Sequence, residues 1–255
     1  MDQIIDKARE YQPGLIAVDR TVPGRNENYQ TPELTVPKQQ LDYPWESCIT
    51  LTNHWGWWKD APYKSAAQVI NILTEIVAKG GSLVLGVGPT PEGTIEEEGI
   101  RRLKEIGQWL KINGEAIYNT RTTPVYQSEN VWFTANKDGK TLYAIYALPD
   151  NVELPQEIVW EGNEPAGKMV LLQTGRSVKY RTKDGKVTVT LPKGLKNESR
   201  VFQFKHKLYC CFLANYLLLS KYEKHLNRSH AEGFIYRRMY QVVFVGRDLL
   251  FRRDE

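Results

Sequence analysis

The feature that most constrains the fold is an alternation of amphipathic helices and short apolar strands in the first half of the chain. Residues 64–79 predict a helix that ends at Gly80-Gly81. Its apolar stripe is made by Val69, Ile70, Leu73, Ile76 and Val77. An apolar run at 82–87 and a second amphipathic helix at 95–112 follow. Because buried parallel strands are apolar throughout and alternate with helices, this half predicts a parallel α/β fold.

Three earlier segments extend this pattern. Residues 2–11 predict an amphipathic helix, residues 15–18 a buried parallel strand, and residues 47–51 a second short strand. In such folds the functional residues gather beyond the carboxyl ends of the strands. Arg20, the loop that follows it, and the HWGWW sequence at 54–58 therefore belong at that edge.

The long loop between Arg20 and Trp58 is the best candidate for a binding site. Two of its glutamates, Glu33 and Glu46, lie among many aromatic residues, and Pro32, Pro37 and Pro44 stiffen the backbone around them. Aromatic rings stack on the apolar faces of sugars, while carboxylates accept hydroxyl hydrogen bonds or move protons. Long loops in compact domains are usually functional. The loop therefore predicts a sugar site, although any one of its aromatics could instead belong to the core.

The pattern changes near Thr120, where short alternating segments separated by Asp-Gly turns begin. The predicted strands are 131–136, 141–147, 157–160, 168–173, 177–182, 186–191 and 201–205. This spacing is typical of an antiparallel β-sandwich. We therefore divide the chain into an α/β part at 1–119, an all-β part at 120–205, and a tail at 206–255.

The tail fits neither pattern. It carries nine Lys/Arg and five Asp/Glu, which accounts for the whole net charge of +4. The rest of the chain is close to neutral, which argues against a nucleic-acid-binding face there. The tail could be an amphipathic segment for a partner or a membrane surface, or a segment without a fold of its own.

Other function classes find little support in the sequence. No apolar run of about twenty residues predicts a membrane span, and the first residues do not read as a signal peptide. Three cysteines, two of them adjacent, and four scattered histidines give no metal-ligand spacing and no disulfide framework.

Several sequences, taken together and in order, resemble glycoside hydrolase family 29, the α-L-fucosidases. They are YQTPELTVP, PWESCITL, HWGWW, YKS, LxxIVAKGGSLVLGVGPTPEGTI and IGQWLKINGEAIYNTR, and the resemblance runs from about residue 10 to 205. It implies the carboxyl-terminal part of a TIM-like (β/α) barrel followed by a β-sandwich. It also implies retaining hydrolysis of terminal α-L-fucose, with a fucosylated glycan as substrate and no metal or organic cofactor.

The resemblance assigns roles to individual residues. Glu33, in TPE, corresponds to the general acid/base, Arg20 to a fucose-contacting arginine, and Trp57 to an aromatic against the fucose methyl group. The register of Trp57 with Trp55 and Trp58 stays open. Glu46 is the rival carboxylate, which the residues alone do not rank below Glu33.

The resemblance also implies that the nucleophile, an aspartate on an earlier strand, is not in this chain; Asp19 is a tempting substitute from position alone. We therefore expect a truncated copy with little or no activity by itself. One alternative is a non-catalytic fragment that binds carbohydrate through the β-sandwich, with Tyr126, Trp132 or Trp160 as its platform. Another is a half-enzyme that docks with a separate amino-terminal half. Full-length relatives imply a periplasmic, extracellular or lysosomal location.

Overall fold

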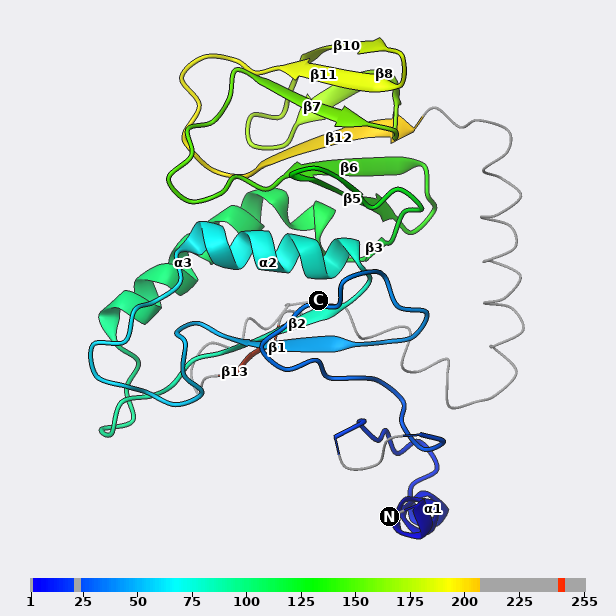
Figure 1. The fold of residues 1–255 in the computed structure, drawn as a ribbon, viewed down its shortest axis with the longest axis vertical. Helices are drawn as coiled ribbons and strands as arrows, with labels where there is room; N and C mark the ends of the chain where they lie inside the picture. The colour runs from blue at the N-terminus through cyan, green and yellow to red at the C-terminus, as the bar shows by residue number, and fades with distance from the viewer. Residues whose placement is uncertain (1, 21–23, 207–242, 246–255) are drawn as a thin grey trace.

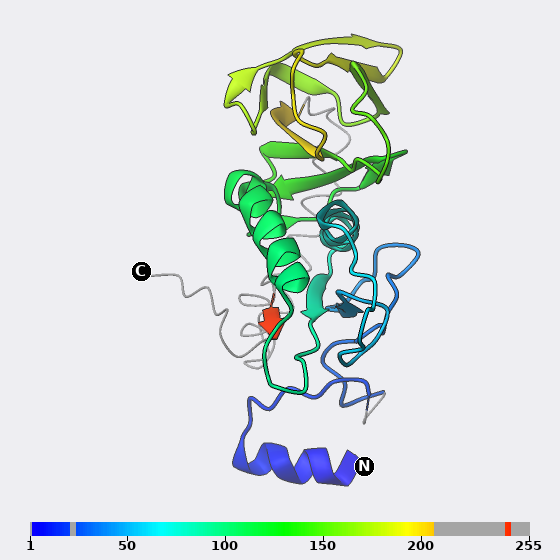
Figure 2. The same ribbon diagram turned by 90° about the vertical axis from the view of Figure 1, so that its left-hand side faces the viewer.

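The computed structural model describes residues 2–20, 24–206 and 243–245, and Figure 1 shows them as successive layers. A small parallel sheet lies at one side of a helical layer, and two antiparallel sheets lie at the other side. The helix α1 (Asp2–Tyr11) projects away from these layers, which is clearest in Figure 2. It has the predicted bounds but no buried residue. The layers match the predicted combination of a partial barrel and a β-sandwich.

The parallel sheet contains β1 (Glu46–Thr50), β2 (Ser82–Gly86) and β13 (Val243–Val245) in the order β1-β2-β13. The predicted strands at 47–51 and 82–87 are therefore confirmed. β13 comes from the tail and pairs in parallel with β2, with Val243 opposite Val84. The remainder of the tail, and with it the predicted apolar segment after Lys207, lies outside the described residues.

The predicted strand at residues 15–18 is wrong. This segment makes a single parallel bridge, between Val18 and Tyr29, and is otherwise irregular. Ala17 is buried, but Ile16 is 46% exposed. A parallel strand needs paired neighbours and covered faces, and within the described residues this segment is bridged on one side only.

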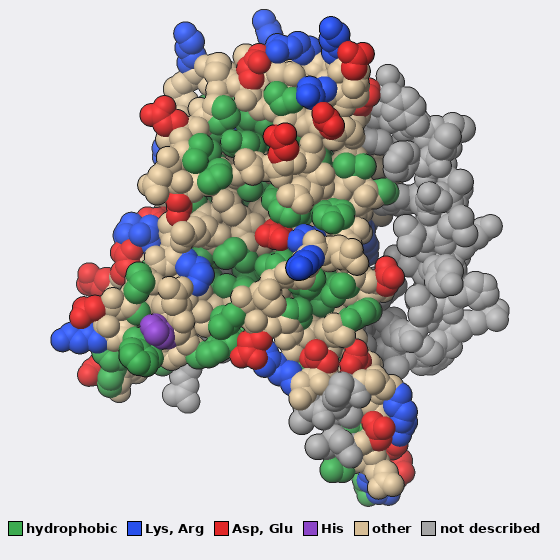
Figure 3. Space-filling model, in the orientation of Figure 1, with side chains coloured by type: hydrophobic (Ala, Val, Ile, Leu, Met, Phe, Trp, Pro, Cys, Tyr) green, Lys and Arg blue, Asp and Glu red, His purple; other side chains and the backbone are tan. Residues whose placement is uncertain are grey.

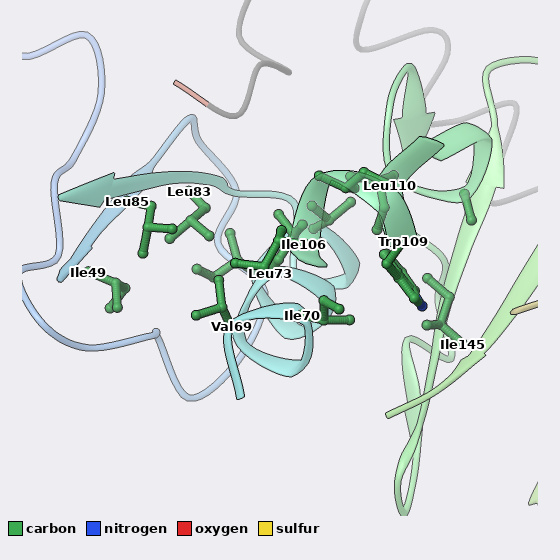
Figure 4. Packing of buried hydrophobic residues seen from close by; sticks show 14 of the residues in the cluster. Ile49, Val69, Ile70, Leu73, Leu83, Leu85, Ile106, Trp109, Leu110 and Ile145 are labelled. Atoms are coloured by element: carbon green, nitrogen blue, oxygen red, sulfur yellow. The ribbon is translucent and has the colours of Figure 1, made fainter. Parts of the chain in front are cut away.

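The helical layer consists of α2 (Ala66–Ala78) and α3 (Glu97–Asn113), followed by the short helix η1 (Gly114–Ala116). α2 begins at Ser65 with a complete capping box, because the Ser65 side chain and the Gln68 side chain each bond the other's backbone amide. Figure 4 shows the apolar faces of both helices packed between the parallel sheet and Ile145 of β6 (Thr141–Tyr146). One core therefore joins the parallel sheet, the helices and the larger antiparallel sheet.

The antiparallel part begins with β3 (Thr120–Arg121), β4 (Gln127–Ser128) and β5 (Val131–Asn136). It continues through β6 to β7 (Glu157–Glu161), β8 (Pro165–Leu171), β9 (Arg176–Ser177), β10 (Lys179–Lys183), β11 (Lys186–Thr190) and β12 (Arg200–His206). One sheet has the order β3-β5-β6-β12-β8-β9, with β4 beside β5, and the other β10-β11-β7. All seven predicted strands are present, and sequence reasoning missed only the two-residue strands.

The aromatic platform considered for the β-sandwich is contradicted at both tryptophans. Trp160 is 1% exposed and lies in the sandwich core against the rings of Phe133, Phe202 and Phe204. Trp132 is also buried, with the Lys79 ammonium 5.4 Å from its ring centroid. Alternating strand positions placed both indoles in the interior, so neither can stack on a sugar.

Trp45, in the long loop after Arg20, is also buried and so is not available to bind a sugar. It is 1% exposed and lies directly over Gly81. A Cβ at residue 81 would come within 2.4 Å of the Trp45 ring. The glycine that follows α2 is thus needed for close packing, and Trp45 anchors the loop that carries both candidate glutamates.

Candidate active site

Arg20 and Glu33 form an ion pair, with 2.5 Å between Arg20 Nη1 and Glu33 Oε2. Both side chains are close to half exposed, at 44% and 47%. The hydrogen bond to the Glu33 carboxylate raises the pKa of Arg20. The predicted acid/base and the predicted sugar-contacting arginine are therefore brought together where solvent or a ligand can reach them.

Thr31 connects this pair to Asp19. Its hydroxyl accepts a hydrogen bond from Arg20 Nε at 2.9 Å and donates one to Asp19 Oδ1 at 2.8 Å. The Thr31 amide also donates to Asp19 Oδ1, at 3.1 Å. The guanidinium is thereby held on two sides, by Thr31 and by Glu33. Asp19, which its position in the sequence made a candidate nucleophile, accepts both hydrogen bonds from Thr31 and fixes that residue.

The backbone around Glu33 explains why the carboxylate is held in place. The segment runs parallel to β1 through bridges from Gln30 to Trp45 and from Glu33 to Cys48. Leu34 then adopts a left-handed conformation with φ 55°, and its amide donates to the Cys48 carbonyl. Such a conformation is costly for a residue with a Cβ and is concentrated at functional sites. The turn redirects the chain immediately after Glu33.

Glu46, the rival carboxylate, belongs to the same electrostatic neighbourhood. Burial raises its pKa. Burial also raises the pKa of the Tyr29 phenol, and the charges of Glu46 and Asp19 add to that shift. The pKa of the Cys48 thiol is raised by burial, against an opposing effect of Arg20. The charges of Arg20, Glu46 and Glu33 therefore all act on the Cys48 thiol.

Trp57 lies on the loop after β1 and is held by the segment after β2. Its indole nitrogen donates to Glu96 Oε1 at 2.9 Å, and the Tyr63 hydroxyl donates to Glu96 Oε2 at 3.0 Å. Burial and the bond to Glu96 raise the pKa of Tyr63 to about 12. The loops that follow the carboxyl ends of two adjacent parallel strands are thus joined by one carboxylate.

The neighbouring tryptophans are more exposed than Trp57. Trp58 is 62% exposed and stacks on His54, with ring centroids 4.6 Å apart, while Trp55 is also exposed. Figure 3 shows hydrophobic side chains beside a histidine at this outer end of the molecule. Within the described residues, no hydrogen bond, ion pair or ring contact joins Trp55, Trp57 or Trp58 to the Arg20–Glu33 pair.

Sequence reasoning missed four residues that support the site: Thr31, Tyr63, Lys64 and Glu96. Lys64 Nζ donates to the carbonyls of Thr50 and Thr52, each at 2.8 Å, and burial lowers its pKa. Glu96 lies in the acidic run 96–98, at the start of the helix predicted at 95–112. The signal that could have found Glu96 is its residue type, because glutamate is an unusual N-cap residue for a helix.

The part of the chain that the structure describes shows neither a metal site nor a membrane-spanning helix. No group of three or more His, Cys, Asp or Glu residues is placed to hold a metal ion there. None of the helices in that part of the chain has the length and apolar character needed to cross a membrane.

Comparison with known proteins relates the chain to one family. The family model described as alpha-L-fucosidase matches residues 1–115. The human plasma alpha-L-fucosidase is 38% identical over 120 residues, covering 43% of this chain and 25% of that protein. The Rattus norvegicus plasma alpha-L-fucosidase is 33% identical over 171 residues, covering 62% of this chain and 36% of that protein.

Solved structures extend the likeness beyond the matched segment. The alpha-L-fucosidase isoenzyme 1 from Paenibacillus thiaminolyticus has a TM-score of 0.68 and 26% identity, and the likeness covers 81% of this chain and 53% of that one. A GH29 alpha-L-fucosidase from Bacteroides thetaiotaomicron, at 23% identity and a TM-score of 0.67, shares the fold. The chain spans about half of these structures and no more than 36% of the curated relatives cited above. Over residues 1–115 the chain thus matches the α-L-fucosidases, and its fold is shared with a solved α-L-fucosidase of glycoside hydrolase family 29.

Proposed function

We propose that this chain carries the acid/base carboxylate and part of the sugar-binding surface of a retaining α-L-fucosidase. Glu33 would protonate the glycosidic oxygen as the bond to the anomeric carbon breaks and a nucleophilic carboxylate takes that carbon. The Glu33 carboxylate would then accept a proton from the water that releases fucose from the covalent intermediate. The observation that carries this proposal is the Arg20–Glu33 ion pair, in which Thr31 also holds the guanidinium.

This arrangement suits two tasks, proton transfer by Glu33 and sugar binding by Arg20. A general acid must be held within reach of the leaving oxygen, and the left-handed turn at Leu34 limits where Glu33 can lie. The Arg20 guanidinium offers donors to sugar hydroxyls from a position fixed by Thr31. Trp57 would supply the apolar surface for the methyl group of fucose, with Trp55 and Trp58 as the alternatives for that contact.

Glu46 is the competing assignment for the acid. A general acid that works near neutral pH needs a raised pKa, and burial raises the pKa of Glu46. The two assignments differ in the expected effect of a conservative change. With an amino-terminal half of the barrel supplied, Glu33→Gln should reduce turnover by about 10²–10⁴-fold if Glu33 is the acid, whereas Glu46→Gln should then retain most of it.

A retaining mechanism also needs a second carboxylate about 5–5.5 Å from the first. Asp19 is committed to Thr31 through two hydrogen bonds, so we do not assign it that role. We propose that the chain by itself turns over an aryl α-L-fucoside very slowly, because the acid alone gives a small part of an enzymatic acceleration. Rapid turnover that Asp19→Asn abolishes would identify Asp19 as the nucleophile and refute this proposal.

Sugar binding tests the site without requiring turnover. We expect L-fucose to bind the whole chain, and Arg20→Ala to weaken that binding. Arg181→Ala is the matched control, because Arg181 forms a comparably exposed ion pair with Glu157 on the β-sandwich. Equal fucose affinities for the wild type, Arg20→Ala and Arg181→Ala would remove Arg20 from the site. An absence of fucose binding in all three would contradict the proposed function.

We further propose a separate amino-terminal half of the barrel as a partner. A parallel barrel strand could add to this sheet only at an unpaired edge, and β13 pairs with β2 at one such edge. Deleting residues 207–255 should therefore strengthen binding of a supplied amino-terminal half. Weaker binding after the deletion would show that the tail contributes to the interface.

The names of the plasma relatives point to a place where this protein works. We propose an extracellular, periplasmic or lysosomal location, as for a glycan hydrolase that meets its substrate outside the cytosol. Fractionation of cells that express the full-length gene tests this, since recovery of the protein in the cytosol alone would contradict it.

A further inference from the structure

Glu96 occupies the N-cap of α3 without acting as a cap. The N-cap side chain normally accepts a hydrogen bond from an amide in the first helical turn. The Glu96 carboxylate makes no such bond. Its two oxygens instead accept hydrogen bonds from the Trp57 indole and the Tyr63 hydroxyl, which lie in the segment between β1 and α2. Helix α3 therefore begins without a side-chain cap, and the Glu96 carboxylate instead connects α3 to the segment that contains Trp57 and Tyr63.

The two partners of Glu96 are themselves confined by glycines. A Cβ at Gly88 would lie 2.4 Å from the Trp57 backbone nitrogen, so the turn after β2 touches the Trp57 loop directly. A Cβ at Gly99 of α3 would lie 3.1 Å from the Tyr63 ring. Trp57 and Tyr63 therefore meet Glu96 from defined positions, and the distances of 2.9 and 3.0 Å are those of well-formed hydrogen bonds.

The contrast with Trp58 shows what Glu96 does for Trp57. Trp58 is adjacent in sequence, but it is 62% exposed and contacts only the His54 ring among the described aromatic residues. Trp57 is partly buried, and its one polar atom is bonded to an ionisable group. A bond to a charged acceptor is about twice as strong as one between neutral groups. The Trp57 ring is thereby fixed in its rotation as well as in its position.

We infer that Glu96 is a positioning residue for Trp57, and that it sets how strongly the site distinguishes a methyl group from a hydroxymethyl group on the sugar. The inference rests on the proposed function, in which Trp57 contacts the sugar. A ring held at a fixed angle offers a flat apolar surface to a methyl group and leaves a hydroxyl there without a partner. L-Fucose and L-galactose differ by this hydroxyl, so Glu96 controls the ratio of their affinities.

The position of the ring can be measured without any sugar. The whole chain is labelled with 5-fluorotryptophan, and the ¹⁹F resonance of Trp57 is assigned as the one missing from Trp57→Phe. Glu96→Ala should shift and broaden that resonance, while Glu96→Gln should largely preserve it, because the amide oxygen still accepts from the indole. Glu97→Ala is the matched control, since Glu97 is an exposed acid in the same helical turn. Tyr63→Phe removes one of the two bonds and should have an intermediate effect.

The sugar measurement then separates positioning from general support of the fold. Glu96→Ala should weaken L-fucose binding by up to about tenfold, the cost of ordering one freed side chain when the sugar binds, and should lower the fucose-to-galactose ratio. Glu97→Ala and Glu96→Gln should keep both values near those of the wild type. Equal losses for the two sugars in Glu96→Ala would overturn the inference, because a structural role predicts that result. So would an unmoved Trp57 resonance.

The two proposals fail in different ways. If neither sugar binds the wild type, the proposed function fails, and with it the assignment of Glu96 to sugar selectivity. If the wild type binds fucose, Trp57→Phe weakens that binding, and Glu96→Ala does not, the proposed function stands and the inference about Glu96 is wrong.

Discussion

Replacing Gly81 with alanine tests the packing that anchors the candidate site. A Cβ at this position would approach the Trp45 ring to 2.4 Å, well inside van der Waals contact. Trp45 is 1% exposed, so its ring has no solvent to move into. Overpacking of this kind typically costs about 1–3 kcal/mol of unfolding free energy, which exceeds the small entropic gain of Gly→Ala. We expect Gly81→Ala to be destabilised by that amount.

Gly107 supplies a matched control with the opposite expected sign. It lies within α3, and a Cβ built there meets no atom within 4 Å. Gly107→Ala should therefore stabilise the protein by about 0.5–1 kcal/mol, because alanine is the better helix former. The two substitutions are chemically identical, so any difference between them must come from their surroundings.

Urea denaturation followed by circular dichroism measures both effects. The midpoint should fall for Gly81→Ala and rise for Gly107→Ala, and the melting temperature should shift by roughly 2–4 °C for each kcal/mol. A Gly81→Ala protein as stable as the wild type would refute the packing argument, because it would mean that the Trp45 ring can move aside freely.

Three further changes probe other parts of the structure. Burial raises the pKa of Glu46 above its ordinary value of 4.5, so the folded state binds more protons than the unfolded state between pH 4.5 and the folded pKa. The unfolding free energy should therefore fall as pH rises through that window, and Glu46→Gln should flatten the dependence in denaturation curves from pH 4 to 8; an unchanged slope would contradict the burial of this carboxyl. Ser65→Ala removes the capping bond to the Gln68 amide and the bonds to Asp150, and should cost about 0.5–2 kcal/mol. The same urea assay would reject this if its midpoint did not move. Trp160→Ala should cost about 3–5 kcal/mol in that assay, and a loss below 1 kcal/mol would mean that the sandwich core tolerates the cavity.

Local sequence signals predicted most of the regular elements. The glycines at 80–81 mark the end of α2, and β5 has the predicted bounds of 131–136. These signals succeed because each depends on residues that are neighbours in the chain. The segment at 15–18 failed for the converse reason. An apolar run becomes a buried strand only where other strands and helices cover it, and such partners are set by the whole fold.

The candidate site was predictable in its residue types and not in its contacts. The resemblance pointed to Arg20 and Glu33, and the structure joins these two in a direct ion pair, with Thr31 holding Arg20. The link from Trp57 to Glu96 joins residues 39 positions apart, and nothing local to either marks it. Trp132 and Trp160 were considered as a sugar-binding platform and are buried, because aromatic composition alone does not distinguish a binding surface from a core.

The core shared by α2, α3 and the first antiparallel sheet has a consequence for how the protein unfolds. Trp109 of α3 donates its indole hydrogen bond to the Ser199 carbonyl, and Tyr143, Ile145 and Val201 lie in the same cluster as the helix side chains. We propose that the division at residues 119/120 is one of topology and not of cooperativity. A chain cut there would expose the apolar faces of both helices to water and would tend to aggregate. The α/β layer and the first antiparallel sheet should therefore melt in one transition.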